Sequence, residues 1–462
     1  MMRILHHTET ENCDNSIQFP SYFIAKDYEH TAKYSKFGSS GMRGLANREI
    51  TPQLALNFGL AVGSIYSNVI IGHDPRVSSE MLESAVVAGL LSAGSEVVKL
   101  GMAPTPTLAL ASHDFDCGIM ITASHNPAQY NGMKIFKKGM SFDTKHQEEI
   151  EDVLNKERFR YASWEKTGSL GVMENALKKH SETILKNTKS ASLNIVLDCG
   201  CGAGSALTPY VLREMGCHVI TLNSQPDGHF PGRNPEPDEE NLSHLKSVVK
   251  ATGADLGIAN DGDADRMMAV DNQGRFVAGD KMLAFFAVRE AKRAIAVPVD
   301  SSRVIDDVLK GIKISRTKVG DVYISEELNK IEGDFGGEPS GAWIFPRISY
   351  CPDGILAAAK LVEMLEEEGN FSTLLDAIPE YPMKRGAFPC QDKKIAMIRI
   401  TEELEKLGRI NALDGVRVDL EEGWILVRPS GTEPKIRITV ESKNECAGLY
   451  KVAEEIVKGA IA

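Results

Sequence analysis

The chain has 462 residues, too many for one hydrophobic core, so roughly three or four domains are expected. Its composition is that of an ordinary globular protein, and its net charge of −12 argues against nucleic-acid binding, which usually needs a basic surface. No apolar run approaches the ~20 residues that cross a bilayer, and the acidic N-terminal segment lacks the apolar stretch of a secretory signal. The eight cysteines are scattered and do not form a disulfide framework. We therefore expect a cytoplasmic protein with reduced thiols and no membrane partner.

Strand and helix signals alternate along most of the chain. Apolar strands are predicted at 69–72, 96–100 and 117–121, with a helix at 78–93. The rhythm restarts with a strand at 194–198, a helix at 206–215, a strand from His218, a helix at 240–250 and a strand at 256–259. It restarts again near Ala294, with helices at 303–310, 324–331 and 355–368. Alternation of this kind predicts three similar α/β units.

From about Pro382 the pattern changes to neighbouring strands. Strands are predicted at 417–420, 424–428 and 436–440, followed by a helix at 444–458. This order predicts a smaller α+β domain with an antiparallel sheet. The expected fold is therefore α/β with mixed sheets, in four domains with boundaries at 1–168, 169–275, 276–378 and 379–462.

Residues 122–127, Thr-Ala-Ser-His-Asn-Pro, directly follow the strand predicted at 117–121, and we call them the serine loop. Ligands collect at the ends of strands in α/β units. Small and turn-forming residues there expose the hydroxyl of Ser124 among backbone N–H groups, and Lys134 adds an ammonium nearby. The six residues alone do not separate this interpretation from an ordinary turn with a satisfied serine and histidine.

Residues 260–266, Asn-Asp-Gly-Asp-Ala-Asp-Arg, follow the strand predicted at 256–259, and we call them the acidic loop. The alternating carboxylates of Asp261, Asp263 and Asp265 would converge on a hard cation such as Mg²⁺ or Ca²⁺. An EF-hand is excluded, because the chain returns at once to a strand-like run at 267–270. Three carboxylates without a cation would repel one another, which disfavours a purely structural role. They also leave coordination positions free for phosphate and water.

Two further loops carry polar groups suited to a sugar phosphate. In the glutamate loop, residues 337–341, Glu338 and Ser340 can bind sugar hydroxyls, although a plain turn is the default interpretation. In the arginine loop, residues 428–435, hydroxyls and N–H groups form an anion-binding nest beside Arg428. A glycine-rich stretch at 197–204 resembles the first motif of S-adenosylmethionine-dependent methyltransferases, but we interpret it as a packing turn.

These four loops, in this order, resemble those of the α-D-phosphohexomutase family, which includes phosphoglucomutase/phosphomannomutase and phosphoglucosamine mutase. The resemblance covers nearly the whole chain. Four shorter signatures add to it: Phe-Gly-Ser-Ser-Gly-Met-Arg-Gly at 37–44, Gly-His-Asp-Pro-Arg at 72–76, Asn-Pro-Glu-Pro at 234–237 and Lys-Val-Gly-Asp at 318–321. It implies four domains around a central cleft.

The resemblance also implies a role for each loop. Ser124 would carry the phosphoryl group, and the three aspartates would hold Mg²⁺. The sugar would be faced by Arg266, Gly320, Glu338 and Ser340. The phosphate that is not transferred would be bound by Arg428, Ser430, Gly431 and Thr432. Phosphoryl and proton transfer would be supported by Arg43, His125 and Lys134.

The sequence departs from the family pattern at two places. Ala342 stands where members often have a histidine after the second glycine of the glutamate loop, so Lys134 or His125 is expected to take more of the proton transfer. Ser39 and Ser40 replace a frequent Thr-Asp pair, which could alter the setting of Arg43.

The implied reaction interconverts a hexose 6-phosphate and 1-phosphate through a phosphoserine and a hexose 1,6-bisphosphate. The glutamate loop followed by Ala-Trp is more similar to the glucosamine branch than to the mannose branch, so glucosamine phosphate is the expected substrate. Phosphomannomutase or phosphoglucomutase activity is the alternative. A metal-dependent sugar phosphatase is less favoured, because the distal phosphate loop is complete. A non-enzymatic sugar-phosphate sensor is less favoured, because Ser124 and the aspartates are intact.

Overall fold

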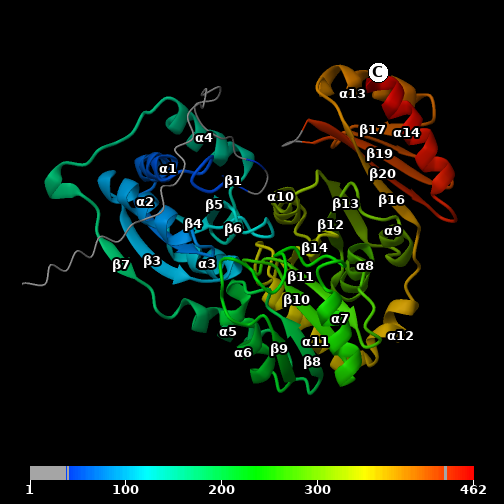
Figure 1. Ribbon diagram of the computed structural model, residues 1–462, viewed down its shortest axis with the longest axis horizontal. Coiled ribbons are helices and arrows are strands. Elements are labelled where there is room, and N and C mark those ends of the chain that lie inside the picture. The colour runs from blue at the N-terminus through cyan, green and yellow to red at the C-terminus, as the bar shows by residue number, and fades with distance from the viewer. Residues whose placement is uncertain (1–37, 39–40, 431–433, 462) are drawn as a thin grey trace, which may run out of the picture. The chain divides into compact units, whose positions relative to one another are not determined.

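The computed structural model describes residues 38, 41–430 and 434–461, and Figure 1 shows how their helices and strands are arranged. These residues form four sheets. Gly431 and Thr432, predicted to bind phosphate, lie outside the described residues, as do Ser39 and Ser40. Within the described part of the chain, no helix is long and apolar enough to cross a membrane.

The first sheet has the strand order β1-β5-β4-β2-β3-β7, with β6 beside β5. Its strands are β1 (Met42–Leu45), β2 (Asn68–His73), β3 (Glu96–Met102), β4 (Cys117–Ile121), β5 (Tyr130–Lys137), β6 (Met140–Ser141) and β7 (Leu170–Val172). Its helices are α1 (Pro52–Ile65), α2 (Ser79–Ser92), α3 (Thr105–Ala111) and α4 (Thr144–Asn155). β4 is completely buried and pairs in parallel with β2 and antiparallel with β5. The serine loop therefore starts at the carboxyl end of a central strand.

The second sheet has the order β11-β10-β8-β9. Its strands are β8 (Asn194–Asp198), β9 (His218–Leu222), β10 (Leu256–Asn260) and β11 (Met267–Asp271), and the helices around it are α5 (Ala176–Lys186), α6 (Thr208–Glu214) and α7 (Ser243–Thr252). β10 and β11 pair antiparallel, with Asn260 opposite Met267. The acidic loop is thus the connection of a hairpin whose two strands are fully buried.

The third sheet has the order β13-β12-β14-β15. Its strands are β12 (Ala294–Pro298), β13 (Lys313–Thr317), β14 (Phe335–Gly337) and β15 (Trp343–Ile344). The helices of this segment are α8 (Gly279–Glu290), α9 (Val304–Val308), α10 (Asp321–Ile331), α11 (Gly354–Glu368) and α12 (Phe371–Asp376). β14 and β15 form a hairpin whose connection is the glutamate loop. One continuous apolar core runs from the second sheet into the third, so these two units share their packing.

The fourth sheet is antiparallel throughout, in the order β16-β20-β19-β18-β17. Its strands are β16 (Met383–Pro389), β17 (Ile410–Asn411), β18 (Val416–Asp419), β19 (Gly423–Pro429) and β20 (Lys435–Ser442), and its helices are α13 (Lys393–Glu405) and α14 (Ala447–Ile461). Both helices share an apolar core with one face of the sheet. The α+β domain expected from the sequence is confirmed, although α13, β16 and β17 were not among the predicted elements.

Several predicted helices have different bounds in the structure; those expected at 240–250 and 444–458, for example, are Ser243–Thr252 and Ala447–Ile461. The helix expected at 324–331 begins earlier, at Asp321, whose carboxylate is favourable in the first turn of a helix. The helix expected at 303–310 is shorter, Val304–Val308. Helix ends are predicted from the periodicity of apolar residues. Because polar residues in the first turn weaken this periodicity, the sequence pattern misplaces the start of such a helix by a few residues.

Candidate active site

Ser124 lies at the end of β4 with its backbone in the left-handed region, at a φ of 50°. A non-glycine residue in this conformation costs free energy and persists only where its surroundings hold it. The buried guanidinium of Arg76 does so, because it donates to the carbonyls of Ser124 at 2.7 Å and Asn126 at 2.6 Å. Thr122 adds a second tie, since its Oγ1 accepts the backbone N–H of Ser124 at 2.8 Å. The serine loop is thus held rigidly before any ligand binds.

The acidic loop brings three buried carboxylates together. One oxygen from each of Asp261, Asp263 and Asp265 lies within 4.8 Å of the others. Burial and the neighbouring carboxylates raise the pKa of Asp261 well above its usual range, and burial and Asp265 raise the pKa of Asp263. Burial opposes ionisation of Asp265 as well, yet Lys134 and Arg266 lower its pKa to about 2. The cluster therefore concentrates negative charge that the protein neutralises only in part.

The serine and acidic loops are in direct contact. Ser124 Oγ donates to Asp261 Oδ2 at 2.6 Å and lies 3.3 Å from Asp265 Oδ1. The backbones also touch, since a Cβ added to Gly262 would lie 2.6 Å from the carbonyl oxygen of Ser124. Glycine is required here because no side chain fits between the loops. The sequence predicted each loop separately, and the structure places them at one point.

Lys134 and His125 flank this point with different protonation. Lys134 Nζ on β5 donates to Asp265 Oδ2 at 2.6 Å and lies 3.8 Å from Asp263 Oδ2. Burial would lower its pKa, but these two carboxylates raise it, so the ammonium stays charged at neutral pH. His125 Nδ1 lies 3.4 Å from Ser124 Oγ, and burial and the surrounding cations hold its pKa well below its usual range. The lysine is therefore a fixed positive charge, whereas the histidine is neutral.

The residues predicted to face the sugar form a connected group. Glu338 accepts the backbone N–H of Gly320 at 2.7 Å and the hydroxyl of Ser340 at 3.1 Å. Burial, with the negative charge of Asp321, raises the pKa of Glu338 to about 7. Arg266, at the end of the acidic loop, donates to Glu236 Oε1 at 2.9 Å. The contacts of Glu338 join the glutamate loop to the start of α10, and the backbone N–H of Met267, which donates to the carbonyl of Gly341 at 2.9 Å, joins the end of the acidic loop to the glutamate loop.

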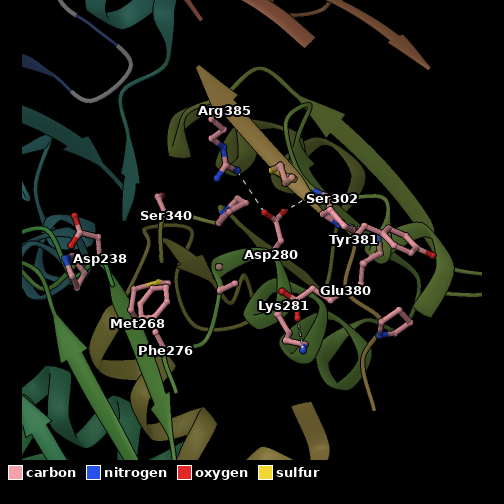
Figure 2. Close-up of a pocket in the computed structure, with 18 of the residues that line it drawn as sticks. Asp238, Met268, Phe276, Asp280, Lys281, Ser302, Ser340, Glu380, Tyr381 and Arg385 are labelled. Atoms are coloured by element: carbon pink, nitrogen blue, oxygen red, sulfur yellow. Dashed lines mark hydrogen bonds and ion pairs between the residues drawn. The ribbon is translucent and has the colours of Figure 1, made fainter. Parts of the chain in front are cut away.

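A cavity of about 550 Å³ opens beside Ser340 and Glu236. Figure 2 shows Asp280 within it, between Ser302 and Arg385. The carboxylate accepts the backbone N–H of Ser302 at 2.7 Å and pairs with Arg385 at 3.7 Å. The cavity therefore borders the glutamate loop on one side and β16 on the other.

The arginine loop is placed apart from the aspartates. Arg428, at the end of β19, pairs with Asp414 at 3.3 Å and Asp300 at 3.8 Å. It also lines a second cavity, of about 430 Å³, together with Arg385 and Arg437. Ser430 donates its backbone N–H to the carbonyl of Lys435 at 2.8 Å, which closes the base of the loop. The positive charge expected of an anion site is present in the described part of this loop.

Four residues with site contacts were absent from the predicted site. Arg76 and Glu236 lie in two of the short signatures, and their roles are visible only as contacts to the serine loop and to Arg266. Asp321 lies in another signature and raises the pKa of Glu338. Thr105 had no motif at all, yet its Oγ1 donates to Asp263 Oδ2 at 2.5 Å. Only the Pro104-Thr105-Pro106 turn after β3 marks its place in the sequence.

The glycine-rich stretch at 197–204 is a packing turn, as interpreted from the sequence. A Cβ on Gly202 would lie 2.7 Å from the carbonyl oxygen of Gly262, and the backbone N–H of Ala203 donates to that oxygen at 2.9 Å. The turn after β8 therefore packs directly against the backbone of the acidic loop and supports it.

Models of all four domains of phosphoglucomutase/phosphomannomutase match the chain: α/β/α domain I at residues 34–161, domain II at 175–274, domain III at 278–381 and the C-terminal domain at 388–459. The chain belongs to the phosphoglucomutase/phosphomannomutase family. The expected fold class and phosphosugar mutase activity are confirmed by this membership.

Relatives in this family are similar over nearly their whole length. A probable phosphoglucosamine mutase of Methanococcoides burtonii is 53% identical over 430 residues, covering 92% of this chain and 99% of that protein. A phosphoglucosamine mutase of Methanocaldococcus jannaschii is 41% identical over 442 residues, covering 92% and 97%.

Solved structures show the same fold. A phosphoglucomutase/phosphomannomutase family protein of Burkholderia thailandensis has a TM-score of 0.82 at 25% identity, covering 92% of this chain and 98% of that one. An Aspergillus fumigatus N-acetylphosphoglucosamine mutase, solved with GlcNAc-6P and magnesium, has a TM-score of 0.59 at 14% identity, covering 94% and 97%.

Proposed function

We propose that this mutase interconverts glucosamine 6-phosphate and glucosamine 1-phosphate, with Ser124 as the phosphoryl carrier. The observation that carries the proposal is the 2.6 Å hydrogen bond from Ser124 Oγ to Asp261, inside a cluster of three carboxylates. A buried serine in a held, left-handed turn beside a cation site is an arrangement suited to phosphoryl transfer. The choice of sugar is supported by relatives named phosphoglucosamine mutase.

The acidic loop fits Mg²⁺. Its donors are carboxylate oxygens, the ligands that this ion prefers, and Asp263 Oδ1 is buried without a hydrogen-bond partner. Asp261, Asp263 and Asp265 would hold the ion. Bound there, Mg²⁺ would neutralise charge on the oxygens of the phosphoryl group.

The chain's own residues divide the remaining work. Lys134 is held charged by Asp265, so it stabilises negative charge and does not serve as a base. Neutral His125, 3.4 Å from Ser124 Oγ, is the group that exchanges a proton with the serine. Arg43 donates to Asn126 Oδ1 at 3.1 Å and so steadies the serine loop. His125, rather than Lys134, thus takes the proton-transfer role left open by Ala342.

In the proposed sequence, a sugar hydroxyl loses its proton and attacks the phosphorus of phosphorylated Ser124. The bond from phosphorus to Ser124 Oγ breaks, and Ser124 Oγ takes up a proton, so that the number of protons is unchanged over the step. The product is a hexose 1,6-bisphosphate. This intermediate reorients in the site, so that its other phosphate faces Ser124 and that phosphoryl group is transferred to the serine. Arg428 and Ser430, with Gly431 and Thr432, would bind the phosphate that is not in transfer. A site that accepts either phosphate fits a loop placed apart from the aspartates.

Two carboxylates support an amino sugar as substrate. After burial, the negative charge of Asp321 is the main cause that raises the pKa of Glu338. Glu338 lies in the glutamate loop, and Asp321 lies at the start of α10. The 2-amino group of glucosamine is an ammonium at neutral pH, whereas glucose and mannose carry a neutral hydroxyl there. The negative charge of this pair would favour the ammonium.

We also propose the domain boundaries at 168, 275 and 378.

The sharpest test compares glucosamine, glucose and mannose 1-phosphates by kcat/KM, with Mg²⁺ and a trace of the matching 1,6-bisphosphate. The proposal expects the amino sugar to be preferred and its 6-phosphate to be the product. A preference for glucose or mannose would overturn the choice of sugar. Release of free phosphate as the main product would indicate a phosphatase, and binding without turnover would indicate a sensor.

A further inference from the structure

Behind the acidic loop, three buried side chains form one hydrogen-bonded row: Thr107, His180 and Asp353. Thr107 Oγ1 lies 2.8 Å from Nδ1 of His180, and Nε2 of His180 lies 2.9 Å from Oδ2 of Asp353. Each residue is at most 3% exposed. A hydroxyl, an imidazole and a carboxylate also make the triad of hydrolases, but there Nε2 of the imidazole faces the hydroxyl and Nδ1 faces the carboxylate, which is the reverse of this row. We therefore look for the role of the row in the contacts that the elements at its two ends, α3 and the start of α11, make with the acidic loop.

The hydrogen bonds of the row have one consistent direction. In the neutral imidazole one nitrogen donates and the other accepts, so a ring that donates its Nε2–H to the carboxylate of Asp353 accepts the hydroxyl proton of Thr107 at Nδ1. The other oxygen of Asp353 accepts the backbone N–H groups of Ile355 and Leu356. Removing the imidazole would leave a buried carboxylate oxygen and a buried hydroxyl without their partner.

One end of the row holds Asp263. Thr107 lies on α3, and the first residue of that helix, Thr105, contacts Asp263 twice. Thr105 Oγ1 donates to Asp263 Oδ2 at 2.5 Å, and the backbone N–H of Thr105 donates to the carbonyl of Asp263 at 2.9 Å. The position of α3 therefore sets the position of this carboxylate.

The other end holds Ala264. Asp353 is the N-cap of α11, and the next residue, Gly354, donates its backbone N–H to the carbonyl of Ala264 at 3.1 Å. The approach is close, since a Cβ on Gly354 would lie 2.3 Å from the carbonyl oxygen of Arg266. Ala264 has a φ of 58°, a conformation that needs support from outside the loop.

We propose that His180 is a positioning residue for the metal centre. It ties the start of α3 to the start of α11, and these two helix starts hold neighbouring residues of the acidic loop, Asp263 and Ala264. The inference rests on the metal site proposed above. Partners that orient metal ligands typically change metal affinity by about 10- to 100-fold when they are removed.

The test measures Mn²⁺ binding to the full-length protein by isothermal titration calorimetry, without substrate. His180→Phe keeps a ring of similar size but cannot hydrogen-bond, and it is expected to raise the Kd by about tenfold. Thr107→Val should change the Kd in the same direction, and His180→Gln, which can still donate to Asp353, should recover part of the affinity. At saturating Mn²⁺ the KM for the sugar phosphate should stay unchanged, because no sugar contact is altered.

A matched control separates positioning from general stability. Ser95 is another buried hydroxyl beside the first sheet, and it donates to the carbonyl of Tyr66 at 2.8 Å. Ser95→Ala should lower Tm without changing the Kd for Mn²⁺. Wild-type affinity in a folded His180→Phe protein would overturn the inference; if that variant does not fold, wild-type affinity in both Thr107→Val and His180→Gln would do so. A wild-type protein that binds no Mn²⁺ would instead overturn the metal site itself.

Discussion

The hydroxyl of Ser124 has two kinds of neighbour. Asp261 Oδ2 accepts a hydrogen bond from Ser124 Oγ at 2.6 Å, while Nδ1 of the neutral His125 ring lies 3.4 Å from the same oxygen. The backbone of Ser124 is held in its left-handed conformation by contacts to its carbonyl and N–H, not by the hydroxyl. Chemistry and conformation at this residue therefore depend on different atoms, and a substitution can separate them.

Ser124→Ala should abolish mutase turnover, by about a thousandfold or more, because the oxygen that carries the phosphoryl group is removed. Stability should change by no more than about 1 kcal/mol, the usual worth of one hydrogen bond. Turnover is measured in a coupled assay, and folding by circular dichroism and Tm. Near-normal turnover in the variant would rule out Ser124 as the carrier.

In the proposed sugar site, Glu338 is expected to make the substrate preference depend on pH. Because its pKa is raised to about 7, it is ionised above that pH and protonated below it. As pH falls from about 7.5 to about 6, the ratio of kcat/KM for glucosamine 1-phosphate to that for glucose 1-phosphate should decrease, since the charge facing the ammonium is lost. The second ionisation of the phosphate, near pH ~6, affects both sugars equally. Glu338→Gln should make the ratio independent of pH over this range; an unchanged slope in the variant would assign the effect elsewhere.

The active site is assembled from connections between strands. The serine loop follows β4, the acidic loop joins β10 to β11, and the glutamate loop joins β14 to β15. Fully buried strands give each connection a rigid base. The first two loops touch through Gly262, where backbone meets backbone. The spacing between them is therefore set by the absence of one side chain.

Gly262→Ala should lower kcat by about 100-fold, because a Cβ 2.6 Å from the carbonyl oxygen of Ser124 forces the two loops apart. Gly448→Ala is the matched control. Gly448 lies in α14 with no atom within 4 Å of an added Cβ, so this change should leave kcat unaltered and stabilise the helix by up to ~1 kcal/mol. Steady-state kinetics and Tm of both variants test the pair. Wild-type kcat in Gly262→Ala would show that the contact does not set the geometry.

Across the molecule, the acidic loop is the point at which separate units meet. Ser124 and Thr105 reach it from the first sheet, Gly202 from the second and Gly354 from the start of α11. The charge of the three aspartates is compensated only in part by Lys134. A cation at this place should therefore stabilise the assembled protein as well as serve its chemistry.

Adding Mg²⁺ should raise Tm. At 100 times the Kd the linked stabilisation is about 2.7 kcal/mol, which corresponds to a shift of several degrees. Asp263→Asn removes one ligand and one repelling charge, so Tm without metal should rise or stay level while the Mg²⁺ shift shrinks. Differential scanning calorimetry at constant ionic strength, with NaCl in place of MgCl₂ as control, measures both effects. An equal shift in the variant would show that Mg²⁺ binds elsewhere.

Local chemistry made much of this protein predictable from its sequence. The buried strand at 117–121 is a continuous apolar run, the strand at 194–198 has an apolar centre, and the bounds of both agree with β4 and β8. The serine and acidic loops stand out because turn-forming and charged residues follow such strands directly. The antiparallel C-terminal sheet is likewise indicated by strands that follow one another without a helix between them. These features depend on neighbours in the chain, which sequence patterns report.

Contacts between distant residues were decided only by the tertiary structure. Nothing near Thr105 or His180 in the chain marks them as supports of the acidic loop, since Asp263 and Asp353, which they contact, lie 158 and 173 residues away from them. The sequence left proton transfer open between Lys134 and His125. Only the fold supplies the surroundings that keep Lys134 charged and His125 neutral, because they come from separate strands and loops. The sequence thus determined which groups are present, and the fold determined their distances and therefore their charge states.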